Sequence, residues 1–208
     1  MDLTELKKEQ LKLKHRVQVR DGFQGTKTIG AVKCTVLDKE LLATVVVCQY
    51  PSMEVIEKQQ AILHNPLPYK PNFSAFREMP AMIDAINKLE QDPDILIVKG
   101  MGINHPRKIG IASHLGLALN LPTIAVSDKL NGGKIENGKI NLDEEIVGFE
   151  IKTREHSNPI YCAPGHLVSL GSVLQIILKT IQHPHKMPEP MHIAHKIGRK
   201  KQKERKNG

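Results

Sequence analysis

The sequence predicts an α/β fold in which a mixed β-sheet is flanked by helices, and two observations support this. Three β-branched stretches follow one another with only short turns between them, at residues 28–37, 41–49 and 53–63. Such a series predicts an antiparallel three-strand meander. A continuous apolar run at residues 95–98 is followed by glycines and then by a helical pattern from Ile111. Because it lacks alternation, this run predicts a parallel strand that is buried on both faces.

The remaining patterns complete this architecture. They predict an amphipathic outer helix at 2–20, a helix at 73–91, strands at 122–127, 146–153 and 159–163, and a long apolar helix at 167–181 that Gly165 and His166 open. Three antiparallel strands followed by alternating helices and strands indicate a ribonuclease H-like fold. We expect a single domain over residues 1–195 and a basic, disordered tail over residues 196–208.

The composition indicates a basic intracellular protein. The chain has 30 Lys and Arg against 22 Asp and Glu, and this net charge of +8 favours an anionic partner such as nucleic acid. The three cysteines, Cys34, Cys48 and Cys162, lack metal-ligand spacing and are expected to be reduced. No apolar run is long enough for a membrane span, and the first residues do not resemble a signal peptide. We therefore expect a cytoplasmic monomer with no membrane partner.

A cation stands where a sheet of this kind would bind a ligand. Lys99 ends the buried strand, and Gly100 and Gly102 follow it. Open α/β sheets bind ligands beyond the carboxyl ends of their strands, and glycines allow backbone to approach a ligand closely. A second lysine, Lys33, lies in the middle of the first strand. An isolated strand lysine most often faces solvent, so these patterns alone leave the role of both lysines open.

Several short motifs occur in the order in which one protein family carries them. They are Tyr50-Pro51-Ser52-Met53-Glu54-Val55, Pro68-Tyr69-Lys70-Pro71, Phe73 with Phe76-Arg77-Glu78, Gly100-Met101-Gly102-Ile103-Asn104-His105-Pro106-Arg107, Pro164-Gly165-His166 and Pro188-Glu189-Pro190. Each motif is weak alone, but the ordered set is specific. Over roughly residues 30–195 the chain resembles endonuclease V, a metal-dependent nuclease that cleaves near deaminated bases, chiefly inosine, in DNA or RNA.

The resemblance implies a carboxylate-rich catalytic centre, and two of its positions differ here. The family carries an aspartate in the first strand, a glutamate after the Phe-Arg pair, a second aspartate before the glycine turn, and a histidine near the start of the last helix. Glu78 and His166 match the glutamate and the histidine. Lys33 and Lys99 stand at the two aspartate positions, and Met101 replaces a histidine between the glycines.

The two lysines argue against an ordinary metal centre. A protonated amine has no lone pair to offer, and an ammonium about 4 Å from a divalent ion costs on the order of several kcal/mol. We therefore expect no cofactor and no metal ligand other than Glu78, whereas an active enzyme would need Mg²⁺ or Mn²⁺. We expect the Lys33 and Lys99 amines to flank the Glu78 carboxylate in an ionic cluster.

The retained motifs supply the expected substrate-binding residues. These are Pro68, Tyr69, Pro71, Gly100, Gly102, Ile103, His105 and Lys129. Tyr69 matches the family's strand-separating wedge and would stack on bases, and Lys129 follows Asp128, which stands where the family carries a lysine. Plain structural roles compete, with Glu78 as a solvated carboxylate and His166 as a helix cap. His183, His185, His192 and His195 form a loose cluster to which the sequence assigns no role.

Three hypotheses of function follow. The leading one is an endonuclease V-family protein that binds inosine-type DNA or RNA, single-stranded or inosine-containing, and has lost or strongly impaired metal-dependent cleavage. The second is an active Mg²⁺-dependent nuclease of DNA repair or inosine-RNA cleavage, with displaced ligands among Glu78, Asp38, Asp94 and Asp128. The third is a protein-binding scaffold of the same fold. Binding without cutting, cutting, or neither would distinguish the three.

Overall fold

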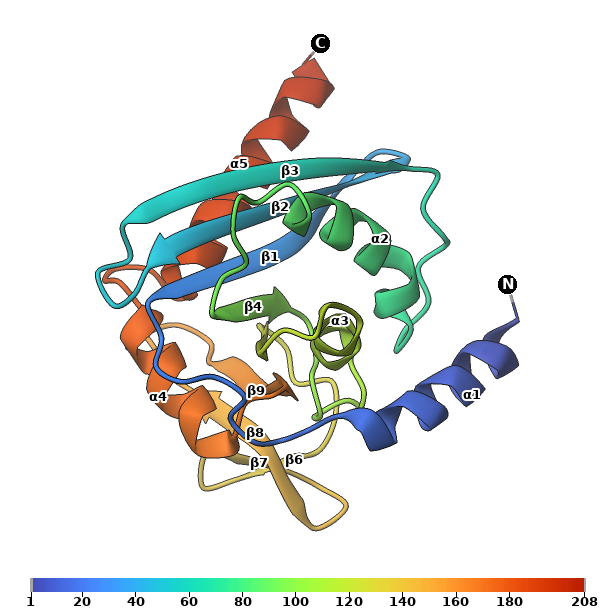
Figure 1. Cartoon of the computed structure of the whole chain (residues 1–208), viewed down its shortest axis with the longest axis vertical. Helices are drawn as coiled ribbons and strands as arrows, with labels where there is room; N and C mark the ends of the chain where they lie inside the picture. The colour runs from blue at the N-terminus through green and yellow to red at the C-terminus, as the bar shows by residue number, and fades with distance from the viewer. Residues whose placement is uncertain (1, 208) are drawn as a thin grey trace.

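The computed structural model describes residues 2–207 and is built on one nine-stranded mixed sheet of order β3-β2-β1-β4-β5-β9-β8-β7-β6. Figure 1 shows this sheet with helices on both sides and α5 projecting beyond the strands β1–β3. The expected ribonuclease H-like α/β architecture is confirmed. Among the described residues, no helix combines the length and apolar character needed to cross a membrane.

The predicted meander is present almost residue for residue. It consists of β1 (Thr28–Leu37), β2 (Glu40–Gln49) and β3 (Val55–His64). β1 and β2 pair antiparallel without interruption from Thr28 opposite Gln49 to Leu37 opposite Glu40. Their Val, Ile and Thr side chains fit the half-buried pleated surface, which explains why the local pattern predicts them well.

The centre of the sheet is parallel, as the apolar run predicts. β4 (Ile95–Lys99) lies between β1 and β5 (Thr123–Ser127) and pairs parallel with both. Beyond β5 the sheet becomes antiparallel again. The strands there are β9 (Ile160–His166), β8 (Glu145–Ile151), β7 (Lys139–Leu142) and β6 (Lys134–Glu136).

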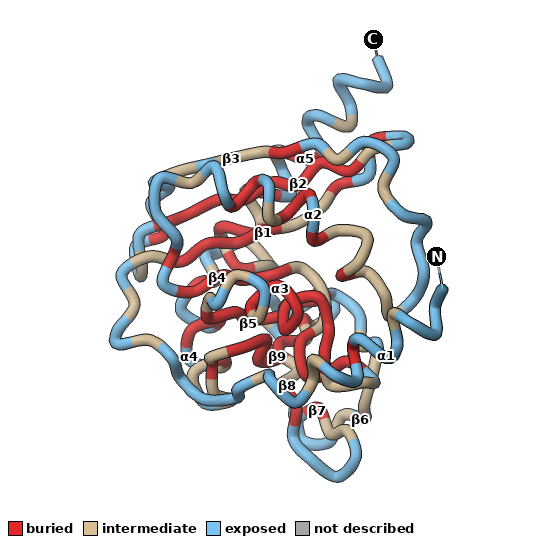
Figure 2. The backbone as a smooth tube through the Cα atoms, turned by 45° about the vertical axis from the view of Figure 1, so that its right-hand side comes forward, coloured by how far each residue is buried: buried red, intermediate tan, exposed pale blue. Residues whose placement is uncertain are grey.

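Two pairs of helices cover the two faces of the sheet. On one face, α2 (Ser74–Ile86) and α3 (Ile111–Leu119) pack on apolar residues that include Val32, Leu96 and Val98. On the other face, α4 (Leu170–Thr180) and α5 (Glu189–Asn207) pack on a second cluster. Figure 2 shows the buried backbone concentrated in the central strands and α3. The side chains of β1 and β4 therefore alternate between two differently covered faces.

The structure corrects the bounds of two expected helices. The helix predicted for residues 2–20 is a helix α1 over Leu3–Leu13 and a short 3₁₀ turn over Lys14–Arg16. The helix predicted from residue 167 begins only at Leu170, because the Ser169 side chain accepts a hydrogen bond from the Ser172 amide and caps it. Gly165 and His166 are consequently the end of β9 rather than a helix start.

The expected disordered tail is also wrong, because residues 196–207 continue helix α5. This helix packs against β1 so closely that a Cβ on Gly198 would lie 2.2 Å from Thr35 Oγ1. Farther along, Gln202 Nε2 donates to the Val36 carbonyl at 2.9 Å, and Arg205 pairs with Glu40. The contacts of Gly198, Gln202 and Arg205 with β1 and β2 hold this highly charged segment against the sheet.

Candidate functional site

Three parallel strands of the sheet centre, β1, β4 and β5, place two lysines and an aspartate next to one another. We call this position, formed by Lys33, Lys99 and Asp128, the lysine edge. Val32 of β1 is opposite Val98 of β4, so the next residues of the two strands, Lys33 and Lys99, lie side by side. Asp128 comes directly after β5, the next strand along. Because Ala31 and Ile97 belong to the cluster beneath α4 and α5, the period of two directs the Lys33 and Lys99 side chains toward that same face.

Lys33 meets a histidine of α5. Its Nζ lies 2.7 Å from His195 Nδ1. Since a lysine ammonium can only donate, His195 accepts at Nδ1 and carries its ring proton on Nε2. Burial and then the charge of Lys99 lower the pKa of Lys33, whereas burial and then Lys33 lower the pKa of His195. The pair is a cation held against a neutral imidazole.

Lys99 meets a carboxylate instead. Its Nζ lies 2.8 Å from Asp128 Oδ1 in a partly exposed ion pair. Burial would raise the pKa of Asp128, but the hydrogen bond and charge of Lys99 hold it below its ordinary value. The two adjacent lysines thus have different partners, and only one of them is neutralised.

Glu78 does not join this pair, which corrects the expected ionic cluster. It belongs to α2 on the opposite face, where its backbone carbonyl faces Cys34 Sγ at 3.8 Å. No ion pair joins Glu78 to a cation among residues 2–207. Burial raises the pKa of Glu78 to about 7, although Arg77 and Lys33 act in the opposite direction. This carboxyl therefore titrates closer to neutral pH than an ordinary glutamate does.

These residues do not fit the divalent ion that a nuclease of this type uses. A hard cation such as Mg²⁺ needs several oxygen ligands close together. The edge offers the protonated amines of Lys33 and Lys99, and residues 2–207 contain no group of three or more His, Cys, Asp or Glu placed to hold a metal. Amines repel the ion and cannot ligate it while protonated.

The structure places His166 away from this edge. His166 pairs with Thr123, at the opposite end of β5 from Asp128. Its Nδ1 accepts a 3.1 Å hydrogen bond from the Gln18 amide, and burial, then Arg16, lowers its pKa. The histidine beside Lys33 is His195. The sequence pattern missed it because α5 was expected to lack order, although the position of His195 within the last helix was the available indication.

The glycine turn that follows β4 is tightly bonded and buried. Gly102 donates its amide to Asn104 Oδ1 at 2.8 Å, and Ile103 donates to the Pro164 carbonyl at 2.9 Å. Gly100 adopts φ +142°, which favours glycine. Gly102 has no room for a side chain, since a Cβ there would lie 2.0 Å from the Pro164 oxygen. The turn therefore presents backbone in one fixed conformation.

His105 fastens this turn to the loop before α2. It is only 1% exposed, and burial, then Arg107, lowers its pKa to about 4, so the ring is neutral. Its Nδ1 accepts from the Arg107 amide and its Nε2 donates to the Asn72 carbonyl, both at 3.1 Å. Arg107 also donates to Asn72 and lies over the Phe73 ring, 4.6 Å from its centroid. In the structure, His105 therefore joins the turn to the loop before α2 through hydrogen bonds.

The rest of the expected substrate-binding set is more open. Pro68, Tyr69 and Pro71 are exposed on the loop, with Tyr69 65% accessible, and Lys129 is exposed after β5. Ile103 is buried.

Two of the possible displaced ligands lie elsewhere. Asp94 is at the amino end of β4, where it accepts from the Lys27 and Thr28 amides, and Asp38 is in the β1–β2 turn.

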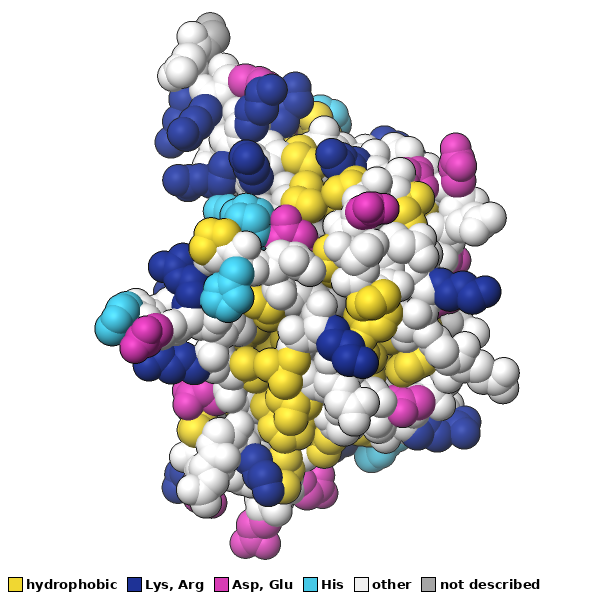
Figure 3. Space-filling model, turned by 90° about the vertical axis from the view of Figure 1, so that its left-hand side faces the viewer, with side chains coloured by type: hydrophobic (Ala, Val, Ile, Leu, Met, Phe, Trp, Pro, Cys, Tyr) yellow, Lys and Arg dark blue, Asp and Glu magenta, His cyan; other side chains and the backbone are white. Residues whose placement is uncertain are grey.

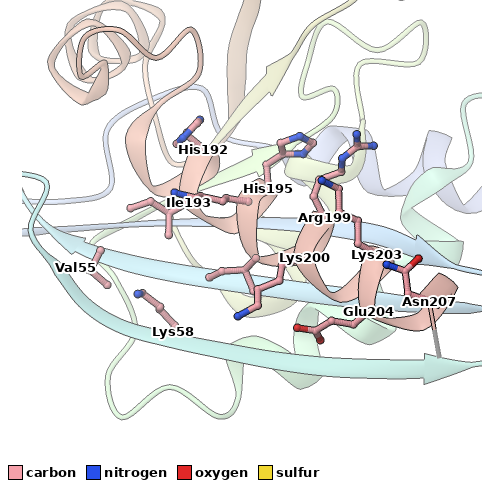
Figure 4. Close-up of a pocket in the computed structure, with 12 residues that line it drawn as sticks. Val55, Lys58, His192, Ile193, His195, Arg199, Lys200, Lys203, Glu204 and Asn207 are labelled. Carbon is pink, nitrogen blue, oxygen red and sulfur yellow. The ribbon is translucent and has the colours of Figure 1, made fainter.

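A groove extends from His195 along α5. It has a volume of about 1090 Å³ and lies between α5 and β3. Figure 4 shows Val55 and Lys58 of β3 on one side, and His195, Arg199, Lys200 and Lys203 of α5 on the other. In Figure 3, Lys and Arg side chains gather on the projecting end of α5. The groove combines an apolar lining with cations and leads away from Lys33.

Sequence comparisons agree with this architecture. The endonuclease V family profile matches residues 11–196. Endonuclease V of Dictyoglomus thermophilum is 33% identical over 92% of the chain and 87% of its own length. Endonuclease V of Rippkaea orientalis is 35% identical over 96% of the chain and 91% of its own length.

Structure comparisons give the same result. The crystal structure of human ENDOV superposes with a TM-score of 0.87 at 26% identity, over 98% of this chain and 99% of that one. Endonuclease V of Bacillus subtilis gives 0.88 at 27% identity, over 100% and 95%. Endonuclease V of Ciona intestinalis, solved with DNA containing an inosine, gives 0.87 at 23% identity over 97% of each chain, a likeness of fold.

Proposed function

Because the chain belongs to the endonuclease V family of nucleic-acid-binding nucleases, we propose that it binds inosine-type DNA or RNA at the lysine edge and does not cleave it by a metal-dependent route. The observation that supports this is the pair Lys33 and Lys99, which lie side by side where β4 ends next to the middle of β1. These amines oppose a divalent cation but attract a phosphate. Catalysis would then have been removed while the attraction for the backbone was kept.

Charge continues from the edge into the groove. Arg199, Lys200 and Lys203 follow His195 along one side of α5. A strand whose phosphates contact Lys33 can extend along these cations, each of which can neutralise a further phosphate. Such binding releases counterions, so affinity falls steeply as salt rises. The exposed Tyr69 supplies a surface on which a base can stack.

The buried turn supports a preference for a particular base. Gly100 adopts φ +142° and Gly102 lies against the Pro164 carbonyl, so the turn holds its backbone groups in one conformation. A flipped base is read by hydrogen bonds to its edge, and backbone groups can make these. Inosine is the base to test, since the Ciona intestinalis enzyme was solved with DNA containing it.

One binding and cleavage experiment separates the possible functions. Labelled single strands with one inosine, or adenosine in its place, are titrated with the protein at about 50 and 200 mM salt and then incubated with Mg²⁺ or Mn²⁺. We expect binding that weakens with salt, is unaffected by EDTA, and leaves both strands intact. Metal-dependent cleavage that Glu78→Gln abolishes would establish the active nuclease instead. Absence of any binding would leave the protein-binding scaffold.

A further inference from the structure

Lys33 and Lys99 differ in what neutralises them. Lys99 Nζ forms an ion pair with the carboxylate of Asp128 at 2.8 Å. Lys33 has no carboxylate partner among residues 2–207, and its nearest polar neighbour is His195 Nδ1 at 2.7 Å. An amine whose hydrogen-bond partner is a neutral base can lose its proton to become a nucleophile.

The groups around Lys33 favour that loss. The charges of Lys99 and Arg199 act against a protonated Lys33, whereas Asp128 and Cys34 act for it. Together with burial, the net effect lowers the pKa of Lys33. Lysines placed in this way, desolvated and next to other cations, are the ones that form Schiff bases with carbonyl groups.

We propose that Lys33 forms a Schiff base with the aldehyde of an abasic nucleotide bound at the lysine edge. This rests on the proposed nucleic-acid binding and adds a covalent activity to the same site. Among the parts of a nucleic acid strand, the ring-opened sugar of an abasic position is the one that carries an aldehyde. An abasic position also costs less to turn out of a strand than a paired base does.

The step balances without an oxidant or a metal. Lys33 Nζ gives a proton to His195 Nδ1, and its lone pair attacks the aldehyde carbon, C1′. The N–C bond forms, and a second proton passes from the nitrogen to the carbonyl oxygen, which becomes a hydroxyl. His195 then returns its proton to this hydroxyl, which leaves as water while the nitrogen lone pair forms the second bond to C1′ and an iminium results.

Borohydride trapping tests this directly. Wild-type protein is mixed with a labelled strand containing one abasic deoxyribose, or an intact strand of the same sequence, and sodium borohydride reduces any iminium to a stable amine. We expect a covalent adduct with the abasic strand only, and peptide mass spectrometry should place it on Lys33. Binding is measured in parallel by fluorescence anisotropy, so the adduct is expressed per bound strand.

Two variants make the test specific. Lys33→Arg removes the nucleophile while keeping a cation, and should lower the adduct per bound strand by on the order of tenfold or more. Lys152→Arg, at an exposed position after β8, should leave it unchanged. Mapping on the wild type does not depend on whether Lys33→Arg folds.

The outcomes separate the two proposals. Strong binding without an adduct, or an adduct that maps to another lysine, would overturn the Schiff-base inference and leave the proposed binding in place. No binding of any strand would overturn the proposed function itself.

Discussion

The glycine turn after β4 and the lysine edge beside it are adjacent but built in opposite ways. In the turn, Gly102, Ile103 and His105 are buried and joined by short hydrogen bonds to Asn104, Pro164 and Asn72. At the edge, two lysines lie side by side, and Lys33 faces the imidazole of His195. Under the proposed function, the rigid turn positions a ligand, whereas the lysine edge attracts phosphate and opposes a metal ion. Binding and cutting should therefore separate when each region is changed.

The largest effect is expected in the turn, from Gly102→Ala. The new Cβ would meet the Pro164 carbonyl oxygen at 2.0 Å and its carbon at 2.8 Å, and this backbone cannot move without breaking the Ile103 hydrogen bond. We expect the free energy of unfolding to fall by about 3 kcal/mol or more, measured by urea denaturation.

Gly171→Ala is the matched control for this change. A Cβ at Gly171, in α4, would meet nothing within 4 Å, so stability should stay the same or rise slightly. Equal stability of the Gly102→Ala variant and the wild type would show that the turn is not the rigid element described above.

The next largest effect concerns Glu78 and pH. Its pKa is raised to about 7, so between its ordinary value of 4.5 and about 7 the folded protein keeps a proton that the unfolded chain loses. Stability from this group is therefore full below pH 4.5 and falls, by roughly 2–3 kcal/mol, as pH rises toward 7. We expect the free energy of unfolding of the wild type to fall relative to that of Glu78→Gln between pH 4.5 and about 7, and the two to change in parallel from there to pH 8. Both are measured by denaturation at a series of pH values. Parallel curves throughout would contradict the raised pKa.

Tyr69→Ala should act on binding alone. Since the side chain is 65% accessible, its loss should not change the unfolding midpoint. Lost stacking should weaken binding of a single strand by about 1–3 kcal/mol in anisotropy titrations. Tyr69→Phe keeps the ring and serves as control. If both variants bind as the wild type does, the loop takes no part in recognition.

The smallest expected effect lies at the far end of the groove. Replacing Lys200 and Lys203 by Gln removes two phosphate partners while leaving the Gln202 and Arg205 contacts of α5 in place. We expect affinity to fall equally for inosine and adenosine strands, and the slope of log K against log salt to become less steep by about 1 per lysine. Lys134→Gln, on the distant β6, is the control. An unchanged slope would place the strand elsewhere.

The sequence predicts best what depends on local pattern. β1 to β5 follow from β-branched and apolar runs whose alternation or continuity can be read directly. The three- and four-residue strands β6 and β7 were missed, because segments so short carry little periodicity and only two turn motifs mark them. Helix α5 was missed because its order depends on a tertiary contact, the packing of Gly198 on Thr35, rather than on its own composition.

The candidate site shows the same limit. The motif positions identified Lys33 and Lys99, and their neighbourhood follows from strand order alone. Their partners could not be predicted, since His195 is 162 residues from Lys33 in the chain and was assigned no role. The expected ionic cluster placed Glu78 between the lysines, but strand alternation puts Lys33 and Cys34 on opposite faces, and Glu78 lies with Cys34.

The most direct test of the central claim, that the lysine edge has exchanged a metal for phosphate contacts, is calorimetric titration of Mn²⁺ into wild type and into the Lys33→Asp, Lys99→Asp double variant. The double variant supplies two carboxylates beside Asp128, which lies next to residue 99, so we expect saturable binding there and none in the wild type. Saturable Mn²⁺ binding by the wild type that Glu78→Ala abolishes would contradict the claim.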